Sequence, residues 1–160
     1  FVYMVSAGIY FLIKEERAFE SYLITLWTGF FLSMLFISIF PTGQELRPES
    51  FTRENPAIWA VKQIYAFDTN TNVFPSMHVV GALTVGVSVF KSRSLKKNCW
   101  VQAVSAISCV LIVLATVFLK QHSILDVFGG IVFYIAAHFI ALGIIKMLDK
   151  TARTDKKINT

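Results

Sequence analysis

The chain has 160 residues, of which 55% are hydrophobic and 16% are charged, with a formal net charge of +5. Its apolar fraction exceeds the roughly 45–50% of soluble globular domains, and its mean hydropathy is +0.60. This composition excludes an ordinary water-soluble domain. The length suits a single domain, and we expect the lipid bilayer to be its solvent.

Four segments come near the length of a membrane-spanning helix, which needs about 20 mostly apolar residues. They are Ser21–Phe40, Phe74–Phe90, Trp100–Leu119 and Asp126–Leu148. The segment Phe1–Ile13 is equally apolar, but it is too short at about 1.5 Å per residue to cross a hydrocarbon core of about 30 Å. We expect it to be part of a helix that begins upstream. The sequence therefore predicts an all-α polytopic transmembrane bundle with five visible spans.

The connection Pro41–Val73 is too long to be a simple turn, and long ordered loops usually carry function or structure of their own. Within it, Asn55 offers a helix N-cap and Pro56 suits the first helical position. Apolar residues then recur on one helical face. We expect a short amphipathic helix over Pro56–Ala66 that lies at the membrane interface.

Most basic residues lie on one side of this topology. With five spans, the first and third connections and the C-terminal end share a side, and they hold eleven of the fifteen basic residues. These are Lys14, Arg17, Lys91, Arg93, Lys96, Lys97, Lys146, Lys150, Arg153, Lys156 and Lys157. The positive-inside rule places this side in the cytoplasm and favours topology signals over a nucleic-acid surface. Residues 1–150 are predicted to form one membrane-embedded domain, and residues 151–160 a polar cytoplasmic tail.

Six polar residues fall on the opposite side of the predicted bundle. They are Arg47, Ser76, His78, Lys120, His122 and Asp126. Polar groups at membrane helices are costly to keep and are usually functional. Arginine and lysine suit an anion, and a helix that starts after Pro75 offers free backbone N–H groups. The set predicts a phosphate site.

The spacing of two of these residues indicates a catalytic pair. His122 and Asp126 are four residues apart, so the carboxylate can accept the Nδ1–H of the imidazole if the segment is helical. Nε2 is then free as nucleophile or base, and His78, from another helix, can protonate a leaving oxygen. A metal site is disfavoured because one acidic residue accompanies two histidines. Taken singly, Lys120 is also explained as a snorkelling lysine, and His138 as an interfacial or helix-bridging residue.

In three motifs the chain resembles the type 2 phosphatidic acid phosphatase superfamily of integral-membrane lipid phosphatases. The motifs are Arg47-Pro48, then Pro75-Ser76-Met77-His78, then His122-x-x-x-Asp126-Val127. The resemblance covers roughly Ser21–Leu148 and implies a six-helix bundle, of which the five spans are the last five. It implies that His122 attacks phosphorus to give a phosphohistidine, which Asp126 orients. His78 would protonate the departing oxygen and later activate water, while Arg47 and Ser76 hold the phosphoryl oxygens.

Two positions depart from the family pattern. The lysine that usually opens the first motif is Phe40 here, and the Ser-Arg pair that usually opens the third motif is Ala115-Thr116. We expect Lys120 to supply a replacement charge. The resulting pattern, Thr116-x-x-x-Lys120-Gln121-His122, resembles the branch that contains inositol phosphorylceramide synthases. Because lysine lacks the bidentate fork of arginine, the phosphate pocket should be built differently from the usual one.

The sequence thus predicts a metal-independent, histidine-dependent enzyme without a cofactor. It should hydrolyse a phosphomonoester or pyrophosphate of a lipid at the extracytoplasmic face of a membrane, compatible with a bacterial plasma membrane. One alternative is a phosphotransferase that moves a phosphoalcohol headgroup between lipids. Another is a non-catalytic protein that binds or transports anionic lipid. Cys99 and Cys109 suggest free thiols and no disulfide framework.

Overall fold

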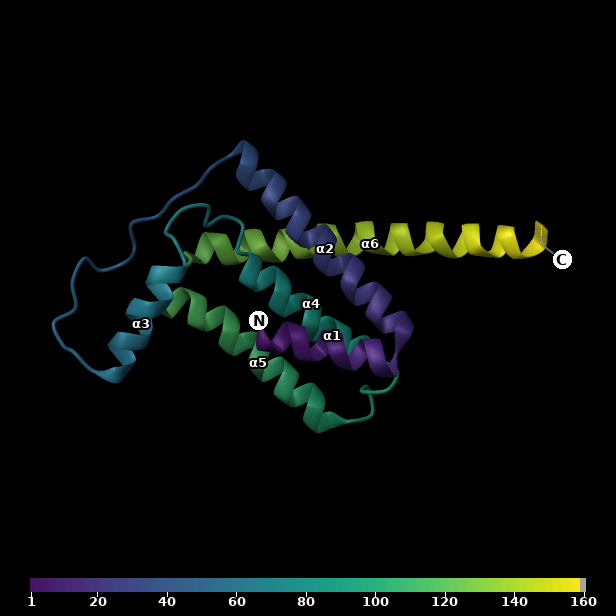
Figure 1. Cartoon of the computed structure of the whole chain (residues 1–160), viewed down its shortest axis with the longest axis horizontal. Helices are drawn as coiled ribbons and strands as arrows, with labels where there is room; N and C mark the ends of the chain where they lie inside the picture. The colour runs from purple at the N-terminus through teal and green to yellow at the C-terminus, as the bar shows by residue number, and fades with distance from the viewer. Residues whose placement is uncertain (159–160) are drawn as a thin grey trace.

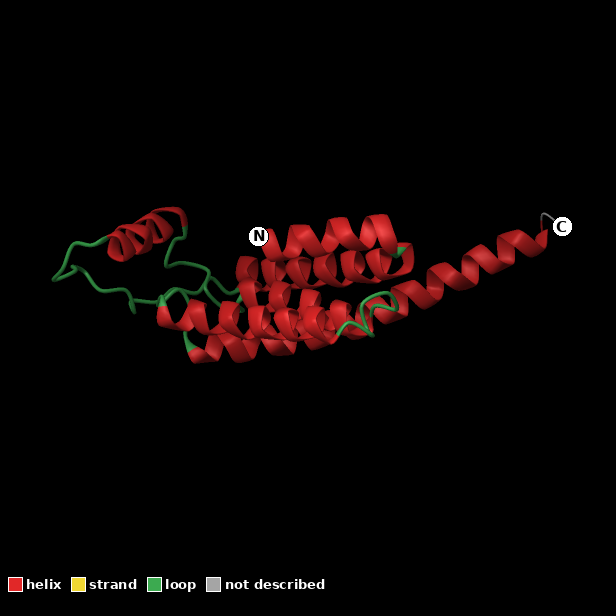
Figure 2. Ribbon diagram, turned by 90° about the horizontal axis from the view of Figure 1, so that it is seen from below, coloured by secondary structure: helices red, strands yellow, loops and turns green. Residues whose placement is uncertain are grey.

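The computed structural model describes residues 1–158, and it consists of helices joined by loops (Figures 1 and 2). The helices within these residues are α1 (Val2–Lys14), α2 (Glu16–Ile39), α3 (Pro56–Phe67), α4 (Met77–Lys91), α5 (Cys99–Phe118) and α6 (Ile124–Ile158). The predicted all-α class is confirmed. Asn159 and Thr160, the end of the predicted polar tail, lie outside the described residues.

Every predicted apolar segment contains a helix, but some helix ends differ from the prediction. Helix α2 begins at Glu16 instead of Ser21, and α6 continues beyond Leu148 through Ile158. Hydropathy marks only the apolar part of a helix, so polar helical turns at its ends are missed. Residues 151–158 of the predicted tail therefore continue α6, whose distal half projects from the bundle (Figure 2).

Helices α2, α5 and α6 are long and apolar enough to cross a membrane. Helices α1 and α4 are apolar but shorter, with 13 and 15 residues. Large apolar side chains such as Trp27, Phe31 and Phe139 are exposed on the outside of the helices, as lipid contact requires. The structure is a helical membrane bundle, and the number of five spans stays a prediction.

Helix α4 is the central element of the bundle. It packs against α1, α2, α5 and α6, and eight of its residues are buried. Small residues at its contacts, including Gly81, Ala82 and Gly86, let neighbouring helices approach closely. Because most of α4 is fixed by packing, its first turn, which carries His78, has a defined position.

The basic connections meet at one end of the bundle. The Glu15 carboxylate, between α1 and α2, accepts hydrogen bonds from the Ser92 hydroxyl at 2.6 Å and the Arg93 N–H at 2.9 Å. Burial raises the pKa of the Glu15 carboxyl, but these hydrogen bonds outweigh it and lower the pKa to about 2. Arg17 pairs with Asp149 of α6 at 2.7 Å. The first connection, the third connection and the distal part of α6 therefore lie together.

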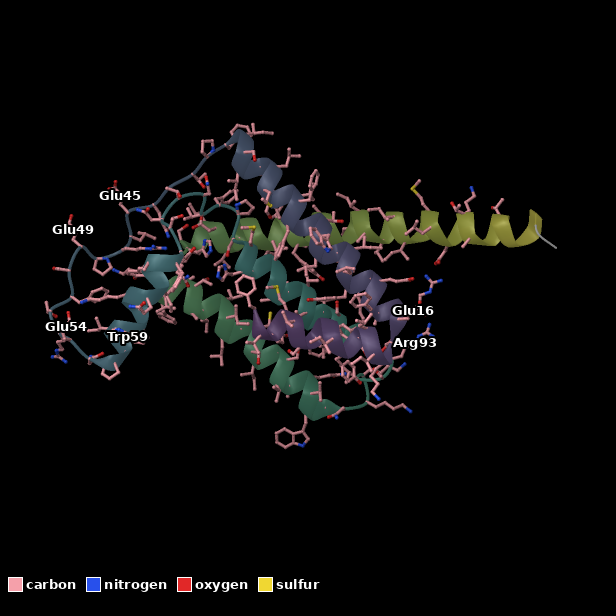
Figure 3. The ribbon with its side chains drawn as sticks, viewed as in Figure 1. Glu16, Glu45, Glu49, Glu54, Trp59 and Arg93 are labelled. Carbon is pink, nitrogen blue, oxygen red and sulfur yellow. The ribbon has the colours of Figure 1, made fainter. Side chains whose placement is uncertain are left out.

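The opposite end carries the loop lobe, which we define as residues 40–73. Its helix α3 lies beyond the end of the bundle where α5 ends and α6 begins (Figures 1 and 2). The predicted N-cap is present, because Asn55 Oδ1 accepts a hydrogen bond from the Ile58 N–H at 2.8 Å. The two arms of the lobe meet where the Gln44 N–H donates to the Asn70 carbonyl at 3.0 Å. Glu49, on the outer side of the lobe, points away from the bundle (Figure 3), and Trp59 of α3 is exposed.

A substitution at Gly29 can test the close packing of α2 against α4 and α6. A Cβ at this position of α2 would lie 2.6 Å from Val80 Cγ1 and 3.4 Å from Ala137 Cβ. We expect Gly29→Ala to lower the free energy of unfolding by about 1–3 kcal/mol through overpacking. This loss should outweigh a gain of up to about 1 kcal/mol in helix propensity. Gly143→Ala in α6 is the matched control, because nothing lies near that position. Thermal unfolding in detergent would compare them, and equal stabilities would contradict the packing described.

Candidate active site

The site lies where the start of α4 meets the start of α6. The backbone N–H of Ser76 donates to the Asp126 carbonyl at 3.1 Å. This approach requires Gly130, because a Cβ there would lie 2.7 Å from the Ser76 carbonyl oxygen. The contact brings the rings of His78 and His122 together, with centroids 5.5 Å apart and ring planes at 64°. Two histidines separated by 44 positions therefore face each other.

His122 and Asp126 are adjacent, as their spacing indicated. His122 lies in the α5–α6 connection, just before α6, and both side chains are buried. Their closest approach, from His122 Nδ1 to Asp126 Oδ2, is 3.7 Å, which is longer than a hydrogen bond. The same Oδ2 accepts the Ser123 N–H at 2.7 Å. His122 Nδ1 has no hydrogen-bond partner within residues 1–158.

The surroundings of His122 favour its neutral form. Burial lowers the pKa of the His122 imidazole, and the neighbouring His78 lowers it further. Asp126 and Asp68 act in the opposite direction, but the net shift of the pKa is downward. A neutral imidazole keeps a lone pair on one nitrogen, which a nucleophile or a general base requires.

Ser76 immediately precedes α4 and is fully buried. Its hydroxyl has no hydrogen-bond partner in the described part of the chain, and α4 has no side-chain cap at its N-terminus. A buried hydroxyl without a partner costs about 1–3 kcal/mol, and a catalytic role or a bound ion is one of the reasons for which proteins keep such a group. The N-terminus of α4 also offers backbone N–H groups and a positive dipole end to an anion.

The guanidinium of Arg47 is held by the end of α3. Its Nη2 donates to Asp68 Oδ2 at 3.2 Å, and its Nη1 donates to the Asp68 and Tyr65 carbonyls. The guanidinium also lies over the Tyr65 ring, 4.5 Å from its centroid. Its Nε is buried and has no partner within residues 1–158. The arginine of the first motif therefore ties the loop lobe together, a role that the motif did not indicate.

Lys120 lies in the connection between α5 and α6, and like His78 it is an exposed residue. Its backbone is left-handed with φ of 52°. Of the two departures from the family pattern, Phe40 is exposed just beyond the end of α2. Thr116 is buried, and its carbonyl accepts the N–H groups of Gln121 and His122 at 2.9 and 3.1 Å. Thr116 therefore anchors the turn that carries His122.

Sequence reasoning missed three residues of the loop lobe that contact this turn, namely Gln44, Tyr65 and Asp68. Their side chains bind residues between Leu119 and Gln121. No spacing rule relates residues that are more than 50 positions apart. The only available signal was the length of the loop that contains them.

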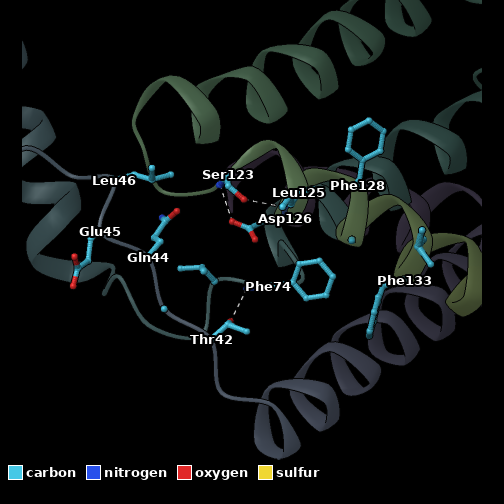
Figure 4. Close-up of a pocket in the computed structure, with 14 residues that line it drawn as sticks. Thr42, Gln44, Glu45, Leu46, Phe74, Ser123, Leu125, Asp126, Phe128 and Phe133 are labelled. Atoms are coloured by element: carbon cyan, nitrogen blue, oxygen red, sulfur yellow. Dashed lines mark hydrogen bonds between the residues drawn. The ribbon is translucent and has the colours of Figure 1, made fainter.

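A pocket of about 750 Å³ opens beside Asp126. Its walls are residues 42–46 of the loop lobe, Phe74 and the first turns of α6. Figure 4 shows Phe74, Phe128 and Phe133 along one part of the pocket, with Gln44 and Asp126 at another. The pocket is mostly apolar, so it offers space for an apolar chain next to the Asp126 carboxylate.

Other groups lie outside this site. Within the part of the chain that the structure describes, no three His, Cys, Asp or Glu side chains are grouped so that they could hold a metal ion. Cys99 and Cys109 are free thiols. The Nε2 atom of His138, on α6, lies 2.7 Å from Lys91 Nζ of α4, so this histidine bridges two helices away from the candidate site.

Comparison with known families agrees with the geometry. The family model of the PAP2 superfamily matches residues 22–150. The chain belongs to the PAP2 superfamily. This confirms the resemblance found in the three motifs, and with the long apolar helices it makes the chain a PAP2 membrane protein. PAP2 proteins are generally phosphatases, and the superfamily implies phosphatase or phosphotransferase activity on lipid-like substrates. Comparisons with curated proteins and with solved structures gave no match.

The pKa of His122 can be measured without any substrate. Histidine-labelled protein in detergent should show by NMR titration a His122 pKa below the ordinary value, because the ring is buried. Asp126→Asn should lower that pKa further, since it removes a negative charge that favours the imidazolium. His78→Ala should raise it, since His78 acts in the opposite direction. An unshifted His122, or a rise in Asp126→Asn, would show that the ring is not in this environment.

Proposed function

We propose that this PAP2 protein is a metal-independent lipid phosphatase that hydrolyses a phosphomonoester or pyrophosphate of a lipid through a phosphohistidine on His122. The observation that carries the proposal is the facing pair of imidazoles. His78 and His122 have ring centroids 5.5 Å apart, and Asp126 lies next to His122. Two histidines and one carboxylate supply a nucleophile, a proton donor and an orienting group without a metal ion.

The reaction takes two steps. In the first, the lone pair of His122 Nε2 forms an N–P bond as the P–O bond to the lipid group breaks, and His78 gives its proton to the departing oxygen. In the second, water attacks phosphorus, His78 takes a proton from that water, and the N–P bond breaks to release phosphate. Asp126 stabilises the positive ring from 3.7 Å, a contact that can shorten when substrate binds.

The phosphoryl oxygens are held by Ser76, Arg47 and Lys120. The Ser76 hydroxyl and Arg47 Nε are buried polar atoms without partners among the described residues, which supports this role. Backbone N–H groups at the start of α4 add donors aimed at an anion. Such fixed donors stabilise the charge that develops on the phosphoryl group in the transition state.

Two observations support a lipid substrate on the outer face. The apolar pocket beside Asp126 suits a lipid chain. The eleven basic residues that sequence analysis assigned to one side belong to the first connection, the third connection and the distal part of α6. These parts lie together at the bundle end opposite the site, and such residues face the cytoplasm in most membrane proteins. The proposed location is an integral membrane enzyme with an extracytoplasmic site, compatible with a bacterial plasma membrane.

Purified protein in detergent, assayed for phosphate release from a panel of lipid phosphates and pyrophosphates, tests the proposal. We expect His122→Ala to abolish release, because the substitution removes the imidazole that is proposed to form the N–P bond. His138→Ala is the matched control and should keep the parent activity, since this histidine bridges α6 and α4 away from the site. Labelled phosphate should be trapped on His122 in the parent protein under alkaline quench.

Three outcomes would change the proposal. Full activity in His122→Ala would show that His122 is not the nucleophile. Loss of activity with excess chelator, restored by a divalent ion, would favour a metal mechanism. Transfer of label to an added lipid alcohol, with little free phosphate, would identify a phosphotransferase.

The role of Lys120 needs a variant that keeps its backbone conformation. Because φ at this position is 52°, Lys120→Asn removes the charge while asparagine tolerates the left-handed region. We expect turnover to fall by roughly ten- to a hundredfold, as for a lost charge-assisted hydrogen bond. Lys120→Gly should lower turnover by a similar factor, since glycine also adopts a left-handed backbone and also lacks the charge. Parent turnover in both variants would make Lys120 an interfacial lysine only.

A further inference from the structure

The turn that carries the proposed nucleophile has its backbone N–H groups bound by carbonyls of α5, but its own carbonyl groups are bound by the loop lobe. It runs from Leu119 to His122, between α5 and α6, and includes the left-handed Lys120. The N–H groups of Gln121 and His122 are bound by the Thr116 carbonyl. The carbonyl groups that follow the end of a helix have no partner within it, so they must be bound from elsewhere.

The loop lobe binds these carbonyls with side chains. The Tyr65 hydroxyl donates to the Leu119 carbonyl at 2.8 Å. The Gln44 side-chain N–H₂ donates to the Lys120 carbonyl at 3.2 Å and also to the Gln121 carbonyl. Each of the three residues before His122 is therefore held by a side chain from outside the bundle.

Asp68 is the third residue of the loop lobe that contacts the turn, and it also binds Arg47. Its Oδ2 accepts the side-chain N–H₂ of Gln121 at 2.8 Å and the Arg47 guanidinium at 3.2 Å. Gln121 is buried, and the Arg47 side chain is only 13% exposed. One carboxylate oxygen thus connects the arginine of the first motif with the residue that precedes His122.

We propose that Asp68 is a positioning residue for the nucleophile, and that it acts through Gln121 while Gln44 and Tyr65 hold the backbone of the same turn. The inference rests on the proposed function, because it takes His122 as the group that attacks phosphorus. A displacement of about 1 Å in a reacting group can cost on the order of a hundredfold in rate. Hydrogen bonds from the loop lobe to the carbonyl side of this turn therefore limit such a displacement of His122.

Asp68 also acts on His122 through its charge. The charged and titratable groups that face His122 are His78 from α4, Asp126 from α6 and Asp68 after α3. The Asp68 carboxylate raises the pKa of the imidazole, against the effect of burial. Geometry and charge can be separated, because one variant can remove the hydrogen bond and another the charge.

Four variants make this separation. Asp68→Asn keeps an oxygen that can accept the Gln121 side chain but loses the charge. Gln121→Ala loses the hydrogen bond but keeps the charge, and Asp68→Ala loses both. Glu54→Gln is the matched control, because it breaks the 2.5 Å ion pair with Lys62 in the same lobe without touching the turn.

We expect Gln121→Ala and Asp68→Ala to lower kcat on the order of ten- to a hundredfold, with little change of KM in Gln121→Ala. Asp68→Asn should recover most of kcat at its optimum. Its acid limb of kcat/KM should move to lower pH, since the imidazolium has lost a neighbouring anion and its pKa falls. Gln121→Ala should leave the acid limb in place. The double variant Asp68→Ala/Gln121→Ala should be no worse than Asp68→Ala, because the two residues act through one contact.

Hydrogen exchange of the backbone amides of residues 119–123 supplies a readout that needs no activity. Exchange should be faster in Gln121→Ala, Asp68→Ala and Gln44→Ala than in the parent, and unchanged in Glu54→Gln. If exchange is faster in these variants but phosphate release does not depend on His122, the proposed function is rejected. The contacts by which the loop lobe holds the turn are then still supported. Parent kcat in Gln121→Ala, in an enzyme that depends on His122, would overturn the positioning role whatever the exchange shows. Should Asp68→Ala fail to fold, Gln121→Ala and Asp68→Asn decide the question alone.

Discussion

The hydrogen bond from the Ser76 N–H to the Asp126 carbonyl, at 3.1 Å, is the contact on which the candidate site depends. It joins the start of the central helix α4 to the first turn of α6, and it is possible because Gly130 has no side chain to separate them. His78 then faces His122 across the contact. The residue that provides this carbonyl also provides the carboxylate next to His122, so the backbone and the side chain of Asp126 are placed together.

A membrane bundle cannot rely on the hydrophobic effect between its helices, because lipid is as apolar as the side chains that the helices bury. Packing of small residues and hydrogen bonds must hold it instead. Here Glu15 and Arg17 link α2 to its neighbours at the basic end. At the other end, the loop lobe links to the α5–α6 connection through Gln44, Tyr65 and Asp68. The helices between these ends can remain almost entirely apolar on their lipid side.

Local features of the sequence predicted local features of the structure. Apolar runs located the bundle helices, and Asn55-Pro56 located the start of α3, because both signals arise from neighbouring residues. The polar ends of α2 and α6 were missed, since hydropathy does not mark them. The site residues came from motifs, but the partners of Arg47 and the contacts of Gln44 with the turn did not. Gln44 lies 76 residues from Lys120, and contacts between two irregular segments leave no periodicity in a sequence.

The shared oxygen of Asp68 connects Arg47, the proposed phosphate ligand, to the turn that carries His122, the proposed nucleophile. Asp68 Oδ2 is bound by Arg47 and by Gln121 at the same time. In the proposed reaction, a phosphoryl group that draws Arg47 toward itself would leave Asp68 without its cationic partner. The uncompensated carboxylate would then favour a positive charge on His122, which develops as Nε2 bonds to phosphorus. Burial otherwise keeps the His122 imidazole neutral. Substrate binding at Arg47 would therefore stabilise the positive charge of this ring as the N–P bond forms.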